Sequence, residues 1–159
     1  MSIRCCGSPC VATTATATIQ DDDVAVLTAG PDQQVIEGNT NARNPLNFTL
    51  QLDRPSVHPI SVSWRAAGGT ATPSVDFVAP NRTAATGVVT IPAGTTSLVV
   101  PVRAIGDTVV EANETVIFSI VGVTNAVVNV VSVTGTVVND DTPPSATINN
   151  VTRLEGNRG

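Results

Sequence analysis

The stretch PLNFTLQLD, residues 45–53, decides the fold of this chain. Apolar and polar side chains alternate strictly along it, and the apolar ones are Leu46, Phe48, Leu50 and Leu52. A two-residue period places every apolar side chain of a strand on one face, so the stretch predicts a half-buried β-strand. A helix would need a period of about 3.6 residues.

The same alternation recurs along the chain and predicts seven strands, at residues 34–37, 45–53, 59–66, 86–91, 96–103, 115–122 and 131–138. Short strands separated by turn residues are typical of a β-sandwich. We therefore expect an all-β fold, a seven-strand antiparallel immunoglobulin-like β-sandwich with essentially no helix. Pro101 predicts an edge strand or a bulge, and Trp64 is expected in the core because it alternates inward with Ile60 and Val62.

Composition limits the function as well as the fold. The chain has 159 residues, enough for one domain with extensions. Its net charge is −5, and its eight basic residues are scattered arginines, which argues against a nucleic-acid partner. No apolar run approaches the roughly 20 residues that a membrane span requires.

The first twelve residues are expected to form an irregular leader. They contain all three cysteines, Cys5, Cys6 and Cys10, but no apolar stretch typical of a signal peptide. Three thiols without a nearby histidine leave a closed zinc site incomplete. The role of these cysteines stays open.

Two separated segments of the sequence repeat at one spacing. TATIQDDD at 16–23 resembles TGTVVNDD at 134–141, and Glu-Gly-Asn at 37–39 recurs at 155–157, both 118 residues apart. A fixed period is typical of tandem repeats. We expect one complete unit at 24–141, the last strand of a preceding unit at 13–23, and a linker with the first strand of a following unit at 142–159. The acids that would then belong to neighbouring units, and should not hold an ion tightly here, are Asp21, Asp22, Asp23 and Glu155.

The acidic residues of the expected unit are unevenly placed. Alternate strands of an antiparallel sandwich end at the same pole, and seven of the nine acids in residues 24–141 fall at strand ends or loops of one pole. These seven are Glu37, Asp76, Asp107, Glu111, Glu114, Asp140 and Asp141. Each pair of like charges a few ångströms apart costs about 1 kcal/mol in water and more near protein, and a bound divalent cation removes that cost. An all-oxygen donor set favours Ca²⁺, with Mg²⁺ as second choice.

Four segments, taken in order, resemble the Calx-beta domain, the calcium-binding module of sodium–calcium exchangers and of many tandem-repeat surface proteins. They are Glu37-Gly38, Gly69 to Phe77, Gly106 to Glu114, and Val138 to Asp141. The resemblance implies a seven-strand immunoglobulin-like sandwich that binds calcium at its distal loops, with the seven acids as its ligands. Gly106 departs from the family, which commonly has an Asp-Asp pair there, so we expect one carboxylate fewer and fewer ions than a full site would hold.

The expected function is a calcium-binding structural module that rigidifies and spaces the repeats of a secreted or cell-surface protein. Its partners would be the neighbouring repeats, with adhesion to a cell-surface or matrix ligand as a further role. The extracellular location follows from the resemblance alone. Two alternatives stay open, a calcium-independent immunoglobulin-like adhesion module and a regulatory calcium-sensor domain of a transporter.

No enzymatic activity is expected. Glu111 and Glu114 could in principle act as the paired acids of a glycosidase, but they lie at a loop pole with no predicted cleft. Almost no aromatic residues are present to stack on a sugar, since the chain has three Phe, one Trp and no Tyr. His58, the one histidine, lies at the opposite pole without a nucleophile signature near it.

Overall fold

The computed structural model describes residues 17, 24–79, 84–153 and 156–157. The predicted leader with Cys5, Cys6 and Cys10, the acids Asp21, Asp22 and Asp23, and Glu155 lie outside these residues. The described residues form strands, turns and loops, and none of them forms a helix long and apolar enough to cross a membrane. The predicted all-β class is therefore confirmed.

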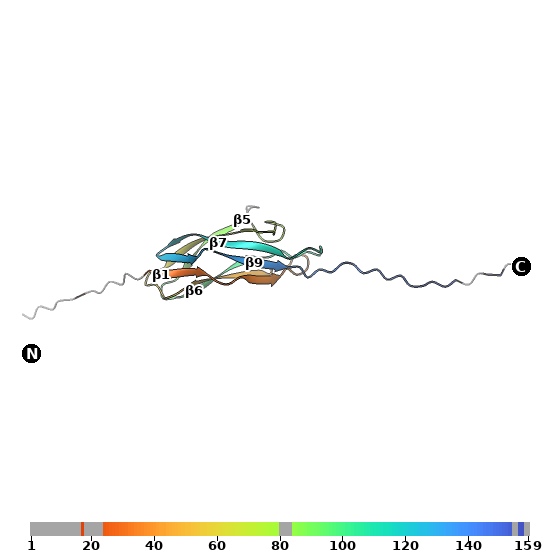
Figure 1. Ribbon diagram of the computed structural model, residues 1–159, viewed down its shortest axis with the longest axis horizontal. Coiled ribbons are helices and arrows are strands. Elements are labelled where there is room, and N and C mark those ends of the chain that lie inside the picture. The colour runs from red at the N-terminus through yellow and green to blue at the C-terminus, as the bar shows by residue number, and fades with distance from the viewer. Residues whose placement is uncertain (1–16, 18–23, 80–83, 154–155, 158–159) are drawn as a thin grey trace, which may run out of the picture.

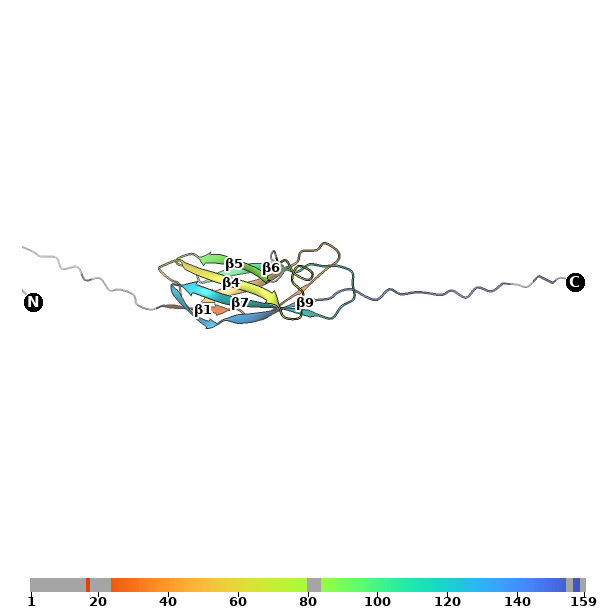
Figure 2. The same ribbon diagram turned by 90° about the horizontal axis from the view of Figure 1, so that it is seen from above.

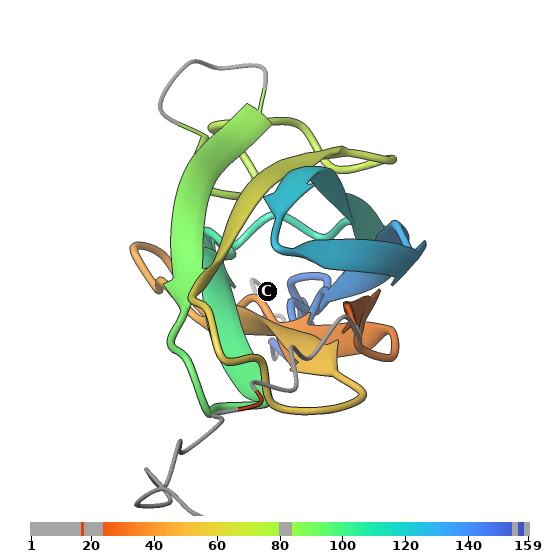
Figure 3. The same ribbon diagram turned by 90° about the vertical axis from the view of Figure 1, so that its left-hand side faces the viewer.

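The described residues contain nine strands in two facing sheets (Figure 1). The first sheet has the order β6-β3-β1-β8, and the second has the order β2-β9-β7-β4-β5. Seen along the long axis, the two sheets curve around a common interior (Figure 3). The strands are β1 (Ala25–Ala29), β2 (Gln33–Ile36), β3 (Pro45–Leu52), β4 (Ile60–Gly68), β5 (Ala84–Ile91), β6 (Ser97–Arg103), β7 (Glu114–Thr124), β8 (Ala126–Val130) and β9 (Ser132–Val138).

The seven predicted strands correspond to β2 to β7 and β9, but the number seven was wrong because β1 and β8 were missed. These two strands pair with each other in parallel, and β2 pairs with β9 in parallel, so the sheets are mixed and not wholly antiparallel. The chain passes from one sheet to the other between β1 and β2, at Gly30 and Pro31, and again between β8 and β9, at Val131. β1 and β2 thus act as two halves of one interrupted strand, and so do β8 and β9. The alternation at 34–37 and 131–138 predicted only the second half of each.

The core joins the two sheets through stacked aromatic rings. Phe48 on β3 lies against Phe118 on β7, with ring centroids 4.6 Å apart, and Trp64 on β4 stacks on Phe118 at 5.5 Å. Both Phe rings are fully buried and Trp64 is partly buried against the core, which agrees with the prediction for Trp64. β6 is an edge strand, as Pro101 predicted.

The strands β2, β4, β6 and β9 all end at one end of the sandwich, and β7 begins there. We call this end the acidic pole. Figure 2 shows the loops gathered at this end, from which the chain continues after β9. The loops are tied together through their main chains, since Ile105 N donates to Asp76 O at 2.8 Å and Gly69 N donates to Thr115 O at 2.8 Å.

Gly106 brings the loop between β6 and β7 against the end of β2. A Cβ atom at this position would lie 1.9 Å from the carbonyl oxygen of Gly38 and 2.6 Å from that of Glu37. These neighbours are main-chain atoms, which cannot turn aside as a side chain could. Glycine is therefore required here for packing, and the position that could have carried a further acid has no room for a side chain.

We expect Gly106→Ala to lower the free energy of unfolding by about 1–3 kcal/mol, the usual cost of overpacking, as measured by urea denaturation. Gly122→Ala is the matched control, because a Cβ there would meet nothing closer than Ser63 Cβ at 3.7 Å. Its effect should stay below about 1 kcal/mol. Equal stability of the two variants would contradict the close approach of Gly106 to β2.

Candidate metal centre

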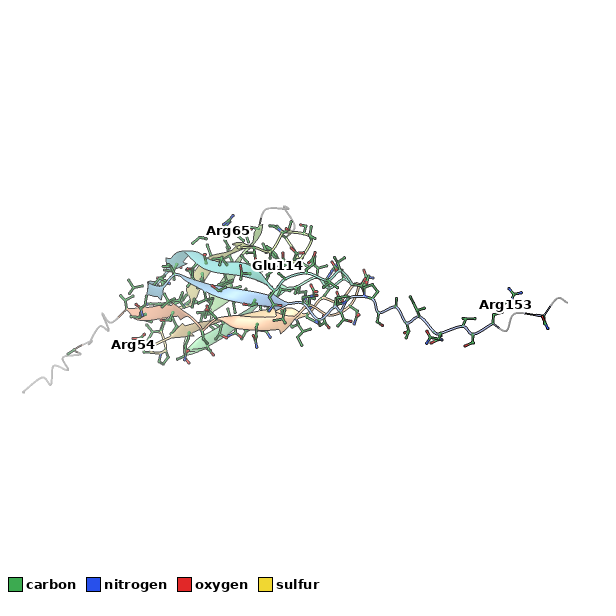
Figure 4. The ribbon with its side chains drawn as sticks, turned by 45° about the vertical axis from the view of Figure 1, so that its right-hand side comes forward. Arg54, Arg65, Glu114 and Arg153 are labelled. Carbon is green, nitrogen blue, oxygen red and sulfur yellow. The ribbon has the colours of Figure 1, made fainter. Side chains whose placement is uncertain are left out.

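The structure brings six of the seven predicted ligands into two groups at the acidic pole. Each group offers three carboxylate oxygens that all lie within 4.8 Å of one another. The first triad is Glu37, Asp107 and Asp141, and the second triad is Asp76, Glu111 and Glu114. Figure 4 shows Glu114 on the side of the sandwich from which the C-terminal segment leaves, with Arg54 at the opposite end.

Glu37 is the most constrained member of the first triad. It follows β2 directly, its main-chain N donates to Val138 O at 3.0 Å, and the residue is only 5% exposed. Its Oε1 atom is buried without a hydrogen-bond partner, and so is Oδ2 of Asp141. Buried oxygens without a donor are costly. Two such oxygens in one triad are therefore available to a cation.

The second triad is held by main-chain donors and by a pair of threonines. Asp76 is 6% exposed, and its Oδ2 accepts a hydrogen bond from Thr72 N. Glu114 begins β7, and the next residue, Thr115, exchanges hydrogen bonds with Thr70: Thr115 N donates to Thr70 Oγ1 at 2.8 Å, and Thr70 N donates to Thr115 Oγ1 at 3.0 Å. Glu111 is exposed, so this triad is more open to solvent than the first.

Asp140, the seventh predicted ligand, belongs to neither triad. Its Oδ1 accepts a hydrogen bond from Gly38 N at 3.1 Å, and the residue is exposed. This bond fastens the segment after β9 to the segment after β2, beside Glu37. Asp140 therefore lies next to the first triad and contributes negative charge to it.

Burial, together with the crowding of carboxyl groups, raises several pKa values at the pole. Burial first, and then the charges of neighbouring acids of both triads and of Asp140, raise the pKa of Glu37 to about 7. Burial, then a hydrogen bond with Asp76, and then like charges raise the pKa of Glu114 to about 7. The pKa values of Glu111 and Asp141 are also raised, mainly by burial. Each triad acts on the other, since Glu111 raises the pKa of Glu37 and Glu37 raises that of Glu114.

The opposite pole shows how an acid behaves when it has partners. Asp53 accepts a hydrogen bond from Val26 N at 2.7 Å and pairs with Arg54 at 3.2 Å. The bond from Val26, above all, holds the pKa of Asp53 below its usual value. At the acidic pole, no arginine among the described residues forms an ion pair with a triad carboxylate. Within the described part of the chain, the triad carboxylates therefore have no ion-pair partner to offset their charge.

Asparagine side chains organise the site, and the sequence analysis missed them. Asn44 Nδ2 donates to Ile36 O at 2.9 Å and to Glu37 O at 3.0 Å. Asn139 connects the segment after β9 to the loop between β6 and β7 by donating to Glu111 O at 2.9 Å. The signal for Asn139 was its place in Asn-Asp-Asp, since asparagine readily binds the main chain two residues further on.

These residues fit a hard cation. Every donor of both triads is a carboxylate oxygen, from four separate segments that the sandwich holds together. Calcium accepts about six to eight oxygens in irregular geometry, including main-chain carbonyls and water. A bound cation would give the two unpartnered oxygens of the first triad a partner, and its charge would offset the repulsion among the carboxylates.

The sequence matches no protein-family model and no curated protein at a significant level. Solved structures resemble it in fold. The apo-form Calx CBD1 domain is 20% identical with a TM-score of 0.60, over 75% of this chain and 100% of that domain. CBD12 from CALX1.2 is 19% identical with a TM-score of 0.62, over 73% of this chain and 46% of that chain.

A second solved structure of this kind, the calcium binding domain CBD12 of CALX1.1, is 19% identical with a TM-score of 0.61. The match covers 72% of this chain and 46% of that chain. This chain therefore spans about half of either CBD12 structure. At these identities the likeness is one of fold. The resemblance predicted from four sequence segments is thus confirmed at the level of architecture, because the chain has the fold of these Calx domains.

Proposed function

We propose that this domain binds calcium at its acidic pole through the two carboxylate triads. The observation that carries the proposal is Glu37, a carboxyl group that is 5% exposed, with Oε1 buried and unpartnered, within 4.8 Å of the oxygens of Asp107 and Asp141. The fold supports it, because the solved domains that share the fold include one described as a calcium binding domain. The proposed ligands are the six carboxylates of the two triads, and Asp140 lies beside the first triad.

Calcium fits the pole better than magnesium does. The donors come from loops of different length and meet around two neighbouring positions. Magnesium requires near-ideal octahedral geometry and gives up its water reluctantly, whereas calcium tolerates irregular sites. Calcium modules outside the cell often work at roughly 10⁻⁴–10⁻³ M.

The mechanical role we propose follows from where the chain leaves the domain. Asp141 and Asp140 directly precede residues 142–153, which form no strand or helix. A cation held by Asp141 would therefore order the start of the connection to a following repeat. Exposed apolar side chains at the same pole would contact that repeat; they are Val75 at 54%, Val109 at 56% and Val110 at 47% exposure.

In this proposal the domain rigidifies and spaces the repeats of a secreted or surface protein. Its partners are the neighbouring repeats, and a cell-surface or matrix ligand would be a further partner. The spacing role rests on the 118-residue repeat in the sequence and on the acids that lie where the chain leaves the domain.

The first test is thermal unfolding with and without calcium. A ligand at about 10–100 times its Kd stabilises the folded state by roughly 1.4–2.7 kcal/mol. For a domain of this size, the unfolding midpoint should rise by at least about 4 °C in 10 mM calcium. Sodium chloride at matched ionic strength is the control, because salt alone screens the charges of the pole, and magnesium at the same concentration should raise the midpoint less.

Variants separate binding at the pole from a general salt effect. Glu111→Gln combined with Glu114→Gln should lose much of the calcium response, since it removes two of the three carboxylates of the second triad. Asp53→Asn removes an acid at the opposite pole and should keep the full response. An unchanged midpoint of the wild-type protein in calcium would instead favour the calcium-independent adhesion module.

The raised pKa values predict an unusual pH dependence of the metal-free protein. Glu37 and Glu114 titrate near pH 7 in the folded state and near 4.5 in the unfolded state, so the folded protein binds more protons between these values. The stability that these two groups contribute without metal should therefore be fully present below about pH 4.5 and should be lost as the pH rises through 7. Unfolding midpoints in metal-stripped buffers across this range measure the effect.

Calcium should remove this loss, because it stabilises the ionised carboxylates. The stabilisation by calcium should accordingly grow from pH 5 to pH 8. Glu37→Gln combined with Glu114→Gln is the control, and its metal-free stability should change much less over the same range. A wild-type stability that rises between pH 5 and pH 7 without metal would contradict the crowded pole.

A further inference from the structure

We propose that Asn139 couples the two triads, so that a calcium ion in one strengthens binding in the other. The inference rests on the proposed calcium function and assigns a positioning role to a neutral residue. Asn139 follows β9 directly and lies between the loop that carries Glu111 and the segment that carries Asp141.

On one side, Asn139 is bound to the loop between β6 and β7. Its Nδ2 donates to Glu111 O at 2.9 Å, and its main-chain N donates to Asn113 Oδ1 at 3.2 Å. These bonds fasten the end of β9 to residues 111–113. They therefore set the main-chain position of Glu111, a member of the second triad.

On the other side, the same side chain holds Asp141. Asn139 Oδ1 accepts a hydrogen bond from Asp141 N at 3.1 Å, which closes a tight turn, and Nδ2 lies 3.5 Å from Asp141 O. Asp141 belongs to the first triad, and its Oδ2 is buried without a partner. One side-chain amide thus positions the main chain of a ligand in each triad.

This arrangement links the ordering of the two sites. An ion in the first triad must immobilise Asp141, and an ion in the second must immobilise Glu111. Because Asn139 joins the two main chains, ordering one of them reduces the entropy lost when the other is ordered, which is positive coupling.

The neutral amide is suited to this place, between two acids of the pole. Its donor Nδ2 faces the carbonyl oxygens of Glu111 and Asp141, and its acceptor Oδ1 faces Asp141 N. A carboxylate here would oppose both carbonyl oxygens and add a charge to a pole whose pKa values are already raised. Serine, by contrast, would keep an oxygen for the turn but lose the donor to Glu111.

The test is a thermodynamic cycle with calcium titration calorimetry on the whole chain. Glu37→Gln disables the first triad, and the calcium affinity of the second triad is then measured with Asn139 present and in the Asn139→Ser variant. We expect Glu37→Gln to weaken the second site by about fivefold more in the wild-type background than in the Asn139→Ser background, within the usual range of coupling. The loss of the Glu37 charge affects the second site equally in both backgrounds, so it cancels in the comparison.

Asn125→Ser is the matched control, because Asn125 Nδ2 donates to Pro59 O at 2.9 Å at the opposite pole, away from both triads. In that background the fivefold effect should persist. Hydrogen exchange of the calcium-free protein gives an independent readout, since Asn139→Ser should speed exchange in residues 107–113, while Asn125→Ser should not.

The outcomes are distinguishable. An equal effect of Glu37→Gln with and without Asn139, in a protein that binds calcium, overturns the coupling role and leaves the calcium function intact. No calcium binding by the wild-type chain overturns the proposed function, and the coupling with it. If Asn139→Ser unfolds the domain at the working temperature, the same comparison is made at a lower temperature at which the variant is folded.

Discussion

The parallel pairing of β2 with β9 is the constraint on which the acidic pole depends. It joins residues about a hundred positions apart, with Ile36 opposite Val138. The register places Glu37 directly beside the segment that carries Asp140 and Asp141, and Gly38 N is bound by Asp140. Without this pairing the first triad could not form, because its carboxylates come from three separate parts of the sequence.

Close packing then makes the pole electrostatically unfavourable on its own. Gly106 allows the loop between β6 and β7 to touch the main chain of Glu37 and Gly38, which brings Asp107 to the same place. Burial and like charge raise the pKa of Glu37 to about 7. The rigid sandwich beneath, closed by Phe48 against Phe118, keeps the loops from separating to relieve the repulsion. Like-charge repulsion thus lowers the stability of this pole, and the proposed cation would offset that repulsion.

Much of the fold could be predicted because strand alternation is local. In residues 45–53 each side chain shows by its own polarity which face it occupies, and the structure buries Leu46, Phe48, Leu50 and Leu52 as expected. β1 and β8 were missed because they are short and pair with each other, although they lie at opposite ends of the domain's sequence. The gathering of acids at one pole followed from strand direction alone, and so could be predicted before any distance was known.

The sequence by itself determined the all-β class, the pole that carries the acids and the oxygen chemistry of the donors, since these depend on residue type and on a two-residue period. Only the tertiary structure decided the division into two triads, the place of Asp140 outside them, the steric need for Gly106 and the bridge made by Asn139. The physical reason is that all four depend on contacts between main chains far apart in sequence. Such contacts exist only once β2 and β9 have paired and the loops have been brought within hydrogen-bonding distance.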